Sequence, residues 1–362
     1  MREPVDVLLV DDSAAMRALL RELLAACDDI RVVGEAADPY EARDRIKALN
    51  PAVIVLDVEM PRMNGLQFLE NLMRLRPTPV VMFSSLTARG AQTTLQAFAL
   101  GAVEVLQKPS GTTDAELAAA ADALARAIRT ASGSKPRMRS APPVAPDKFA
   151  GRIATASRFC LLGASTGGTE ALREVLADWR LRDVAVLIVQ HIPPAFSASF
   201  AERLDRNSPL FVRHAVDGQA LQAGHAYVAP GGRHMRLIRS GTGFALRLDD
   251  TAPVNRHRPS VDVLFASAVS AARSCCGAAL LTGMGDDGAR GLAELRAAGV
   301  PTVAQDEATS VVWGMPGAAV RLDAADAVLP LGAIAEHMAA SAERSRSSSA
   351  RAGRYSETRI PQ

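Results

Sequence analysis

Short apolar runs alternate with amphipathic stretches along the first 130 residues of the chain. The apolar runs are typical of buried strands, and the stretches with apolar residues every three or four positions are typical of helices. The predicted strands are residues 5–10, 30–36, 52–57, 79–85 and 103–107, and the predicted helices are residues 13–26, 39–49, 65–75, 88–100 and 113–129. This succession of β–α units predicts a parallel sheet covered by helices on both faces.

A second α/β pattern begins near residue 158. Apolar runs at residues 158–164, 184–190 and 278–283 each precede a segment with helical periodicity. Between them, residues 211–250 hold shorter alternating runs, which predict short strands and hairpins. We therefore expect a doubly wound, mainly parallel α/β domain in the second half of the chain.

Two segments without apolar periodicity divide and close the chain. Residues 132–152 are rich in proline, glycine and small polar residues, which is typical of a linker. Residues 343–362 are rich in serine and arginine, which predicts a disordered tail. The expected organisation is a first domain at 1–131, a linker at 132–152, a second domain at 153–342 and a tail at 343–362.

Composition and charge exclude several classes of protein. The 41 Lys and Arg residues nearly cancel the 39 Asp and Glu residues, so no net field favours nucleic acid as a partner. No apolar run approaches the ~20 residues of a membrane helix, and the first residues lack the apolar core of a secretory signal. We expect a cytoplasmic protein that acts as a monomer and does not insert into a membrane.

Acidic residues follow two strands of the first predicted sheet. Asp11 and Asp12 come directly after the first strand, and Asp57 ends the third. The carboxyl ends of parallel strands share one edge of a sheet, and three carboxylates there repel one another unless a hard cation neutralises them. This pattern predicts Mg²⁺ held by Asp11, Asp12 and Asp57, and an aspartate beside such a metal is a competent phosphoryl acceptor.

Residues 5 to about 130 resemble the receiver domain of two-component response regulators. The resemblance implies a flavodoxin-like (βα)5 fold, phosphorylation of Asp57 by a histidine kinase, and contacts from Ser84 and Lys108 to the phosphoryl oxygens. One position departs from the pattern, because Val105 stands where receivers often carry an aromatic residue.

The stretch GASTG at residues 163–167 matches the G-x-S-x-G pattern around the nucleophile of many serine hydrolases. Glycine and serine also form ordinary turns, so the pattern alone does not decide. Here it lies between a predicted strand and a predicted helix. Ser165 would therefore stand at a strand-to-helix turn, where backbone N–H groups can stabilise an anion.

A serine nucleophile needs a base, and histidine is the usual one. His191 ends the apolar strand 184–190, whereas the other histidines are predicted to be surface or packing residues: His214, His225, His234, His257 and His337. An orienting carboxylate is available from Asp286 or Asp287, after the strand 278–283. Either could instead cap the following helix, and the sequence does not choose between them.

The motifs GASTGG, QHIPP, YVAPGG, LTGMGDDGA and PTVAQDEATSVVWGMP together resemble the catalytic domain of chemotaxis protein-glutamate methylesterases, the CheB family. The resemblance covers residues 5 to about 340 and implies a phosphorylation-regulated hydrolase. Its substrates would be methylated glutamates, which release methanol, and glutamines, which are deamidated, on methyl-accepting chemotaxis receptors.

The same resemblance implies roles for individual residues. Ser165 would be the nucleophile, His191 the base and Asp287 the carboxylate that orients it. The oxyanion would be stabilised by backbone N–H groups near Met284 and the Ser165 turn, with Thr166 nearby, and the catalytic domain would need no cofactor. Two alternatives stay open: a non-catalytic response-regulator adaptor, and the same enzyme in a chemosensory pathway unrelated to motility.

Overall fold

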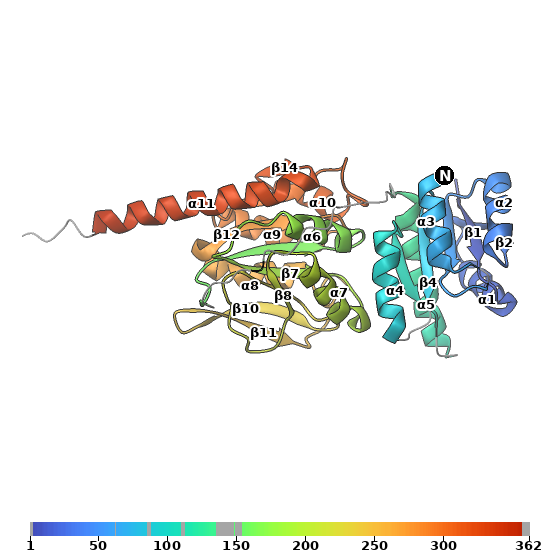
Figure 1. The fold of residues 1–362 in the computed structure, drawn as a ribbon, viewed down its shortest axis with the longest axis horizontal. Helices are drawn as coiled ribbons and strands as arrows, with labels where there is room; N and C mark the ends of the chain where they lie inside the picture. The colour runs from blue at the N-terminus through green and yellow to red at the C-terminus, as the bar shows by residue number, and fades with distance from the viewer. Residues whose placement is uncertain are drawn as a thin grey trace, which may run out of the picture. The chain divides into compact units, whose positions relative to one another are not determined.

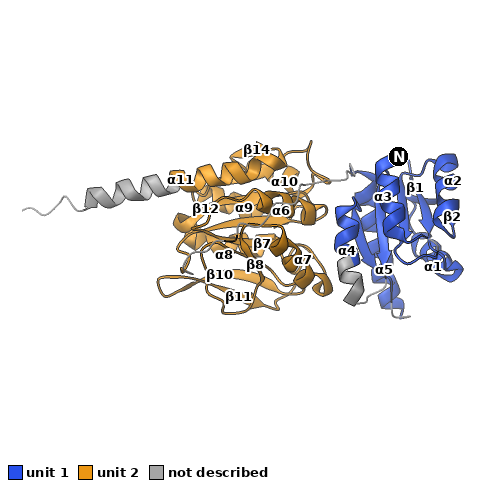
Figure 2. Ribbon diagram, in the orientation of Figure 1, with its two compact units in different colours: residues 1–140 blue, residues 141–362 orange. Residues whose placement is uncertain are grey.

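A computed structural model of the chain describes residues 3–61, 63–84, 88–109, 113–134, 148 and 154–356. The chain splits into two compact units, Met1–Ser140 and Ala141–Gln362 (Figure 2). The predicted linker, residues 132–152, spans this division, and most of it lies outside the described residues.

The first unit contains a five-stranded parallel sheet (Figure 1). The strands are β1 (Val5–Val10), β2 (Ile30–Ala36), β3 (Val53–Asp57), β4 (Val80–Ser84) and β5 (Glu104–Gln107). Their order in the sheet is β2-β1-β3-β4-β5. This is the flavodoxin-like order, so the predicted fold class of the first domain is confirmed.

In the described part of this unit, the helices that connect and cover these strands are α1 (Ala14–Leu24), α2 (Pro39–Leu49), α3 (Gly65–Leu75), α4 (Ala88–Ala99) and α5 (Asp114–Ser132). Side-chain caps mark where several begin. Ser13, Asp38 and Asn64 each accept a hydrogen bond from the first turn of the helix that follows, and Thr113 forms a capping box with Glu116. Apolar residues of α2, α3 and α4 pack with the strands in one core cluster.

The second unit is built on a seven-stranded sheet in which every pair is parallel. Its strands are β6 (Phe159–Ala164), β7 (Ala185–Gln190), β8 (Phe211–His214), β9 (His225–Val228), β12 (Cys275–Leu280), β13 (Thr302–Gln305) and β14 (Ala327–Leu329). Their order is β14-β13-β12-β6-β7-β9-β8. Of the short runs predicted at residues 211–250, β10 (His234–Ser240) and β11 (Gly243–Asp249) form an antiparallel hairpin. The other two, β8 and β9, instead join the parallel sheet.

Helices lie on both faces of this sheet, so the predicted doubly wound architecture is confirmed (Figure 1). They are α6 (Gly168–Ala177), α7 (Pro194–Arg206), α8 (Val261–Ala268), α9 (Ala289–Ala297), α10 (Met315–Arg321) and α11 (Leu331–Ser356), with a 3₁₀ turn at Val269–Ser274. Helix α6 contacts α7 and α11, whereas α8, α9, α10 and the β10–β11 hairpin share another core. The chain extends outward from β6 to β7 on one side and later to β12 on the other. In such sheets a crevice forms where the order reverses, at the carboxyl ends of the central strands.

Helix α11 continues to Ser356 and so enters the segment 343–362 that was expected to be disordered. The composition allows this helix, because the segment is rich in arginine, which favours helices, and its first proline is Pro361, beyond the end of α11. Residues 357–362 lie outside the described residues. Although α11 is long, none of the described helices combines the length and apolarity needed to cross a membrane.

Gly65, at the first position of α3, packs directly on the backbone of Asp57. A Cβ atom at this position would lie 2.0 Å from the Asp57 carbonyl oxygen. We expect Gly65→Ala to destabilise the first unit by about 1–3 kcal/mol, because backbone must move to relieve the overlap. Faster hydrogen exchange in peptides from the first unit would measure this loss of stability.

Gly133→Ala is the matched control, since its Cβ would meet only the Thr130 carbonyl oxygen at 3.9 Å. Both tryptophans, Trp179 and Trp313, belong to the second unit, so their fluorescence reports whether that unit is unaffected. Equal protection of the two variants would contradict the prediction.

Candidate active site

The acidic residues predicted at the edge of the first sheet lie together. One carboxylate oxygen from each of Asp11, Asp12 and Asp57 lies within 4.8 Å of the others. Lys108 Nζ lies 2.9 Å from Asp11 Oδ2 and 2.9 Å from Asp57 Oδ1. The Lys108 backbone N–H donates to the Ser84 carbonyl oxygen at 2.8 Å, so Ser84 belongs to the same edge. The three carboxylates therefore form a cluster that could hold a metal ion.

Asp57 is buried, and its charge is incompletely compensated. Burial raises the pKa of Asp57 to about 6, against the effect of the hydrogen bond from Lys108 and with a further contribution from the charge of Asp11. A cation among these carboxylates would favour the ionised form of Asp57. The donor set therefore fits a hard divalent cation, which prefers carboxylate oxygens.

In the second unit, Ser165 lies immediately after β6, in a turn held by its backbone. The Ser165 N–H donates to the Thr282 carbonyl oxygen at 3.0 Å, which ties the turn to the end of β12. The Ser165 carbonyl oxygen accepts from Gly168 N at 2.7 Å and from the buried Gln190 Nε2 at 2.8 Å. Gln190 Nε2 also donates to the His191 carbonyl oxygen at 3.0 Å. One amide thus links the backbones of Ser165 and His191.

His191 follows β7 and contacts a buried carboxylate. The register of β6 and β7 pairs Ala164 with Gln190, so Ser165 and His191 leave neighbouring strands at the same level. His191 Nε2 lies 2.8 Å from Asp287 Oδ2, and the two side chains are 6% and 1% exposed. His191 Nδ1 is buried and has no hydrogen-bond partner among the described residues, Ser165 included.

Asp287 is surrounded by donors. Besides His191, its carboxylate accepts from Ser260 Oγ at 2.6 Å, Val261 N at 2.7 Å and Asn255 Nδ2 at 2.8 Å. Burial alone would raise the pKa of Asp287, but the hydrogen bonds and charge of His191, with the bonds from Ser260 and Asn255, outweigh burial and hold the pKa well below its usual value. The ionised form of Asp287 is therefore favoured, and a charged carboxylate in this place could orient the imidazole.

Asp286 and Asp287, between which the sequence does not choose, differ in their surroundings. Asp286 is exposed, whereas Asp287 is buried against His191. The N-cap residue of α9 is Gly288 rather than either aspartate, so the alternative role of a side-chain cap does not apply.

The sequence predicts that backbone N–H groups near Met284 and the Ser165 turn stabilise the oxyanion. The N–H of Ser165 itself is engaged by Thr282, so it is not available to a substrate oxygen. Gly283 lies against Ser165, since a Cβ on Gly283 would come within 2.6 Å of Ser165 Cβ. Met284, the next residue, is exposed, and the carbonyl oxygen of Thr166 accepts from Thr282 Oγ1 at 3.0 Å. The loop after β12 therefore lies directly beside Ser165.

Sequence reasoning missed three residues of this site. His257, which the sequence predicted to be a surface or packing residue, stacks on His191 with ring centroids 3.7 Å apart and planes inclined by 9°. Asn255 and Ser260, which donate to Asp287, come from the same irregular segment. No periodicity or motif marked them; they lie shortly before α8 in the structure.

This unit contains another serine–histidine pair, which is an alternative candidate for the nucleophile and its base. Ser197 Oγ lies 3.0 Å from His214 Nε2. Ser197 is buried within α7 and donates to the Pro194 carbonyl oxygen, so it is not exposed to a substrate. His225 and His234 are buried packing residues, as expected.

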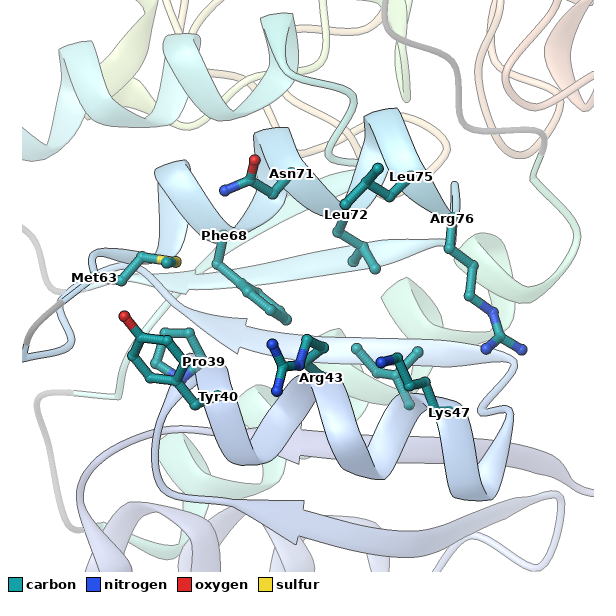
Figure 3. A pocket seen from close by; sticks show the side chains of 11 residues that line it. Pro39, Tyr40, Arg43, Lys47, Met63, Phe68, Asn71, Leu72, Leu75 and Arg76 are labelled. Atoms are coloured by element: carbon teal, nitrogen blue, oxygen red, sulfur yellow. The ribbon is translucent and has the colours of Figure 1, made fainter.

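A groove of about 480 Å³ lies on the first unit, between α2 and α3 (Figure 3). Tyr40 and Phe68 form part of its apolar lining, and Arg43, Lys47 and Arg76 add positive charge. None of the site residues predicted from the sequence lines it, so the groove is separate from both clusters described above.

Comparison with protein families agrees with this two-part organisation. Residues 7–122 match the family model of the response regulator receiver domain, and residues 160–338 match that of the CheB methylesterase. A solved structure of the CheB methylesterase catalytic domain from Thermotoga maritima is similar, with 34% identity, 51% of this chain and 97% of that chain covered, and a TM-score of 0.49.

Curated relatives match nearly the whole chain. A protein-glutamate methylesterase/protein-glutamine glutaminase 2 from Xanthomonas oryzae is 52% identical over 96% of this chain and 99% of its own length. A protein of the same name from Pseudomonas aeruginosa is 50% identical over 94% of this chain and 98% of its own length. The chain therefore belongs to the CheB family, in which a response-regulator receiver precedes a methylesterase domain.

Proposed function

We propose that the second unit is a serine hydrolase that cleaves methyl esters of glutamate, and amides of glutamine, on the cytoplasmic helices of chemotaxis receptors. The relatives at 52% and 50% identity carry both activities in their names. The observation that carries the mechanism is the 2.8 Å contact of His191 with the buried Asp287, at the strand ends beside Ser165. It supports a triad of Ser165, His191 and Asp287.

The proton of Ser165 passes to His191 in this mechanism. Because Asp287 occupies Nε2, the ring can accept that proton only at Nδ1, the nitrogen that has no partner among the described residues. Hydrogen bonds of this kind are often open without substrate and close when it binds. Asp287 stays ionised and stabilises the imidazolium that forms.

The reaction is an ordinary acyl transfer. Ser165 Oγ attacks the γ-carbonyl carbon, and the tetrahedral intermediate collapses when His191 returns the proton to the leaving methoxide, which departs as methanol. Water then hydrolyses the acyl-enzyme by the same route in reverse. With glutamine the leaving group is ammonia. We assign the oxyanion contacts to backbone N–H groups near Met284 and the Ser165 turn, with Thr166 nearby, although the N–H of Ser165 itself donates to Thr282.

The first unit is proposed to control this activity through phosphorylation of Asp57 by a chemotaxis histidine kinase. Asp11, Asp12 and Asp57 would hold Mg²⁺, which neutralises the charge of the incoming phosphoryl group, and Lys108 and Ser84 would contact its oxygens. The linker tethers the two units at high effective concentration, so the unmodified receiver can restrain its neighbour until Asp57 is phosphorylated.

Ser165→Ala is expected to lower methanol release from a methyl-esterified receptor by a factor on the order of 10⁴ or more, because it removes the nucleophile. The matched control is Ser197→Ala, which removes the hydroxyl of the other serine–histidine pair and should leave the rate nearly unchanged. Methanol release that survives in Ser165→Ala, or is lost only in Ser197→Ala, would overturn the assignment.

Asp287→Asn should lower kcat for methanol release by about 10⁴, because the amide no longer holds the required tautomer of His191. Asp286→Asn, one residue away and exposed, should behave as wild type. Steady-state rates of the two folded variants test this directly, and equal losses would argue against a role specific to Asp287.

A small phosphodonor with Mg²⁺ is expected to raise methanol release about 5- to 150-fold in wild type, the usual range of coupling between two sites. Asp57→Asn, or wild type treated with a chelator, should stay at the basal rate. Asp44→Asn on the exposed face of α2 is the control and should respond normally. Full activity of the untreated wild-type chain would contradict the proposed restraint.

A further inference from the structure

The imidazole of His191 is covered on one face by a second imidazole. The rings of His191 and His257 are nearly parallel, with a separation of 3.7 Å between centroids and an angle of 9° between planes. This separation lies in the range of van der Waals contact between carbon atoms, about 3.5–4.0 Å. His257 therefore occupies the whole face of the proposed base, whereas Asp287 touches only its edge.

A tight turn holds His257 in this place. Val254 and His257 exchange two backbone hydrogen bonds, Val254 N to His257 O at 3.1 Å and His257 N to Val254 O at 2.9 Å. The two residues between them, Asn255 and Arg256, have φ of 50° and 67°. Positive φ at both central residues is the mark of a type I′ turn, whose sharp reversal leaves the end residues little freedom.

The same turn also contacts the carboxylate that orients His191. Asn255 Nδ2 donates to Asp287 Oδ1 at 2.8 Å and to Asp262 Oδ2 at 2.7 Å. Asp262 in turn accepts from Gly291 N at 2.8 Å, so the turn is anchored to the starts of both α8 and α9. Asparagine suits this position because it tolerates positive φ and offers an amide donor.

We propose that the turn Val254–His257 positions the catalytic base, and that His257 is the residue of the turn that holds the ring of His191 in place. Among the described residues, Asp287 at Nε2 is the one hydrogen-bond partner of the His191 ring, and a ring held in this way can pivot about that bond. The stacked ring of His257 opposes this motion and keeps Nδ1 directed for the proton of Ser165. This inference rests on the proposed triad and adds a residue that acts through His191 without touching substrate.

The role predicts a specific kinetic pattern. His257→Ala should lower kcat for methanol release roughly 10- to 100-fold, the usual cost of a misplaced catalytic group, with little change in KM. His257→Phe, which restores a flat ring but no ring nitrogen, should recover most of the loss. His225→Ala is the matched control, because His225 stacks on Phe211 elsewhere in the unit.

The experiment uses the full-length chain with Mg²⁺ and a small phosphodonor, and it measures two quantities for each variant. One is kcat and KM for methanol release; the other is the rate at which a small fluorophosphonate labels Ser165, which reports activation of the serine without receptor docking. Tryptophan fluorescence confirms that each variant is folded, and His257→Leu replaces His257→Ala if the latter unfolds.

Slower labelling and lower kcat in His257→Ala, both rescued by His257→Phe, would support the proposal. Wild-type rates in His257→Ala, or a His257→Phe variant as slow as His257→Ala, would overturn it. Failure of the triad itself looks different, because wild type would then not be labelled at Ser165 or Ser165→Ala would still release methanol.

Discussion

The buried charge of Asp287 is the constraint around which the second unit is organised. An ionised carboxylate is strongly disfavoured in a protein interior unless donors satisfy it. Here they come from separate parts of the chain: His191 after β7, Asn255 from a turn, and Ser260 with Val261 at the start of α8. Only the switch in strand order beside β6 brings these parts to one edge of the sheet. Satisfying this charge therefore requires the same arrangement that places a histidine beside Ser165.

The receiver also contains a buried carboxylate, but its pKa is shifted in the opposite direction from that of Asp287. Asp57 is also buried at the end of a parallel strand, but Lys108 compensates its charge only in part, and its pKa is raised to about 6. Asp287 has enough donors to keep its pKa low. The difference matches the two proposed tasks: an orienting carboxylate must remain charged throughout the reaction, whereas a phosphoryl acceptor is completed by a cation and then covalently modified.

Much of this organisation could be predicted from residues at strand ends. Asp11, Asp57, Ser165 and His191 were identified because apolar periodicity located the strands before them. Periodicity does not choose between Asp286 and Asp287, since neighbouring residues in a loop point in different directions according to backbone angles that the sequence does not reveal. His257 was missed for a related reason: its contact with His191 depends on the left-handed turn at Asn255 and Arg256. The parallel pairing of β8 and β9 likewise depends on tertiary contacts that short runs do not encode.

The glycines around Ser165 allow one motif to be a tight turn and a proposed catalytic pattern together. A Cβ on Gly168 would lie 2.2 Å from Gln190 Oε1, the side chain that links the backbones of Ser165 and His191. A Cβ on Gly283 would lie 2.6 Å from Ser165 Cβ. Because Gly168 and Gly283 have no side chains, the end of β7 and the loop after β12 can both lie close to Ser165. A turn and the proposed nucleophile are therefore compatible, because the close packing that needs a glycine turn is what brings the proposed base and oxyanion donors to the serine.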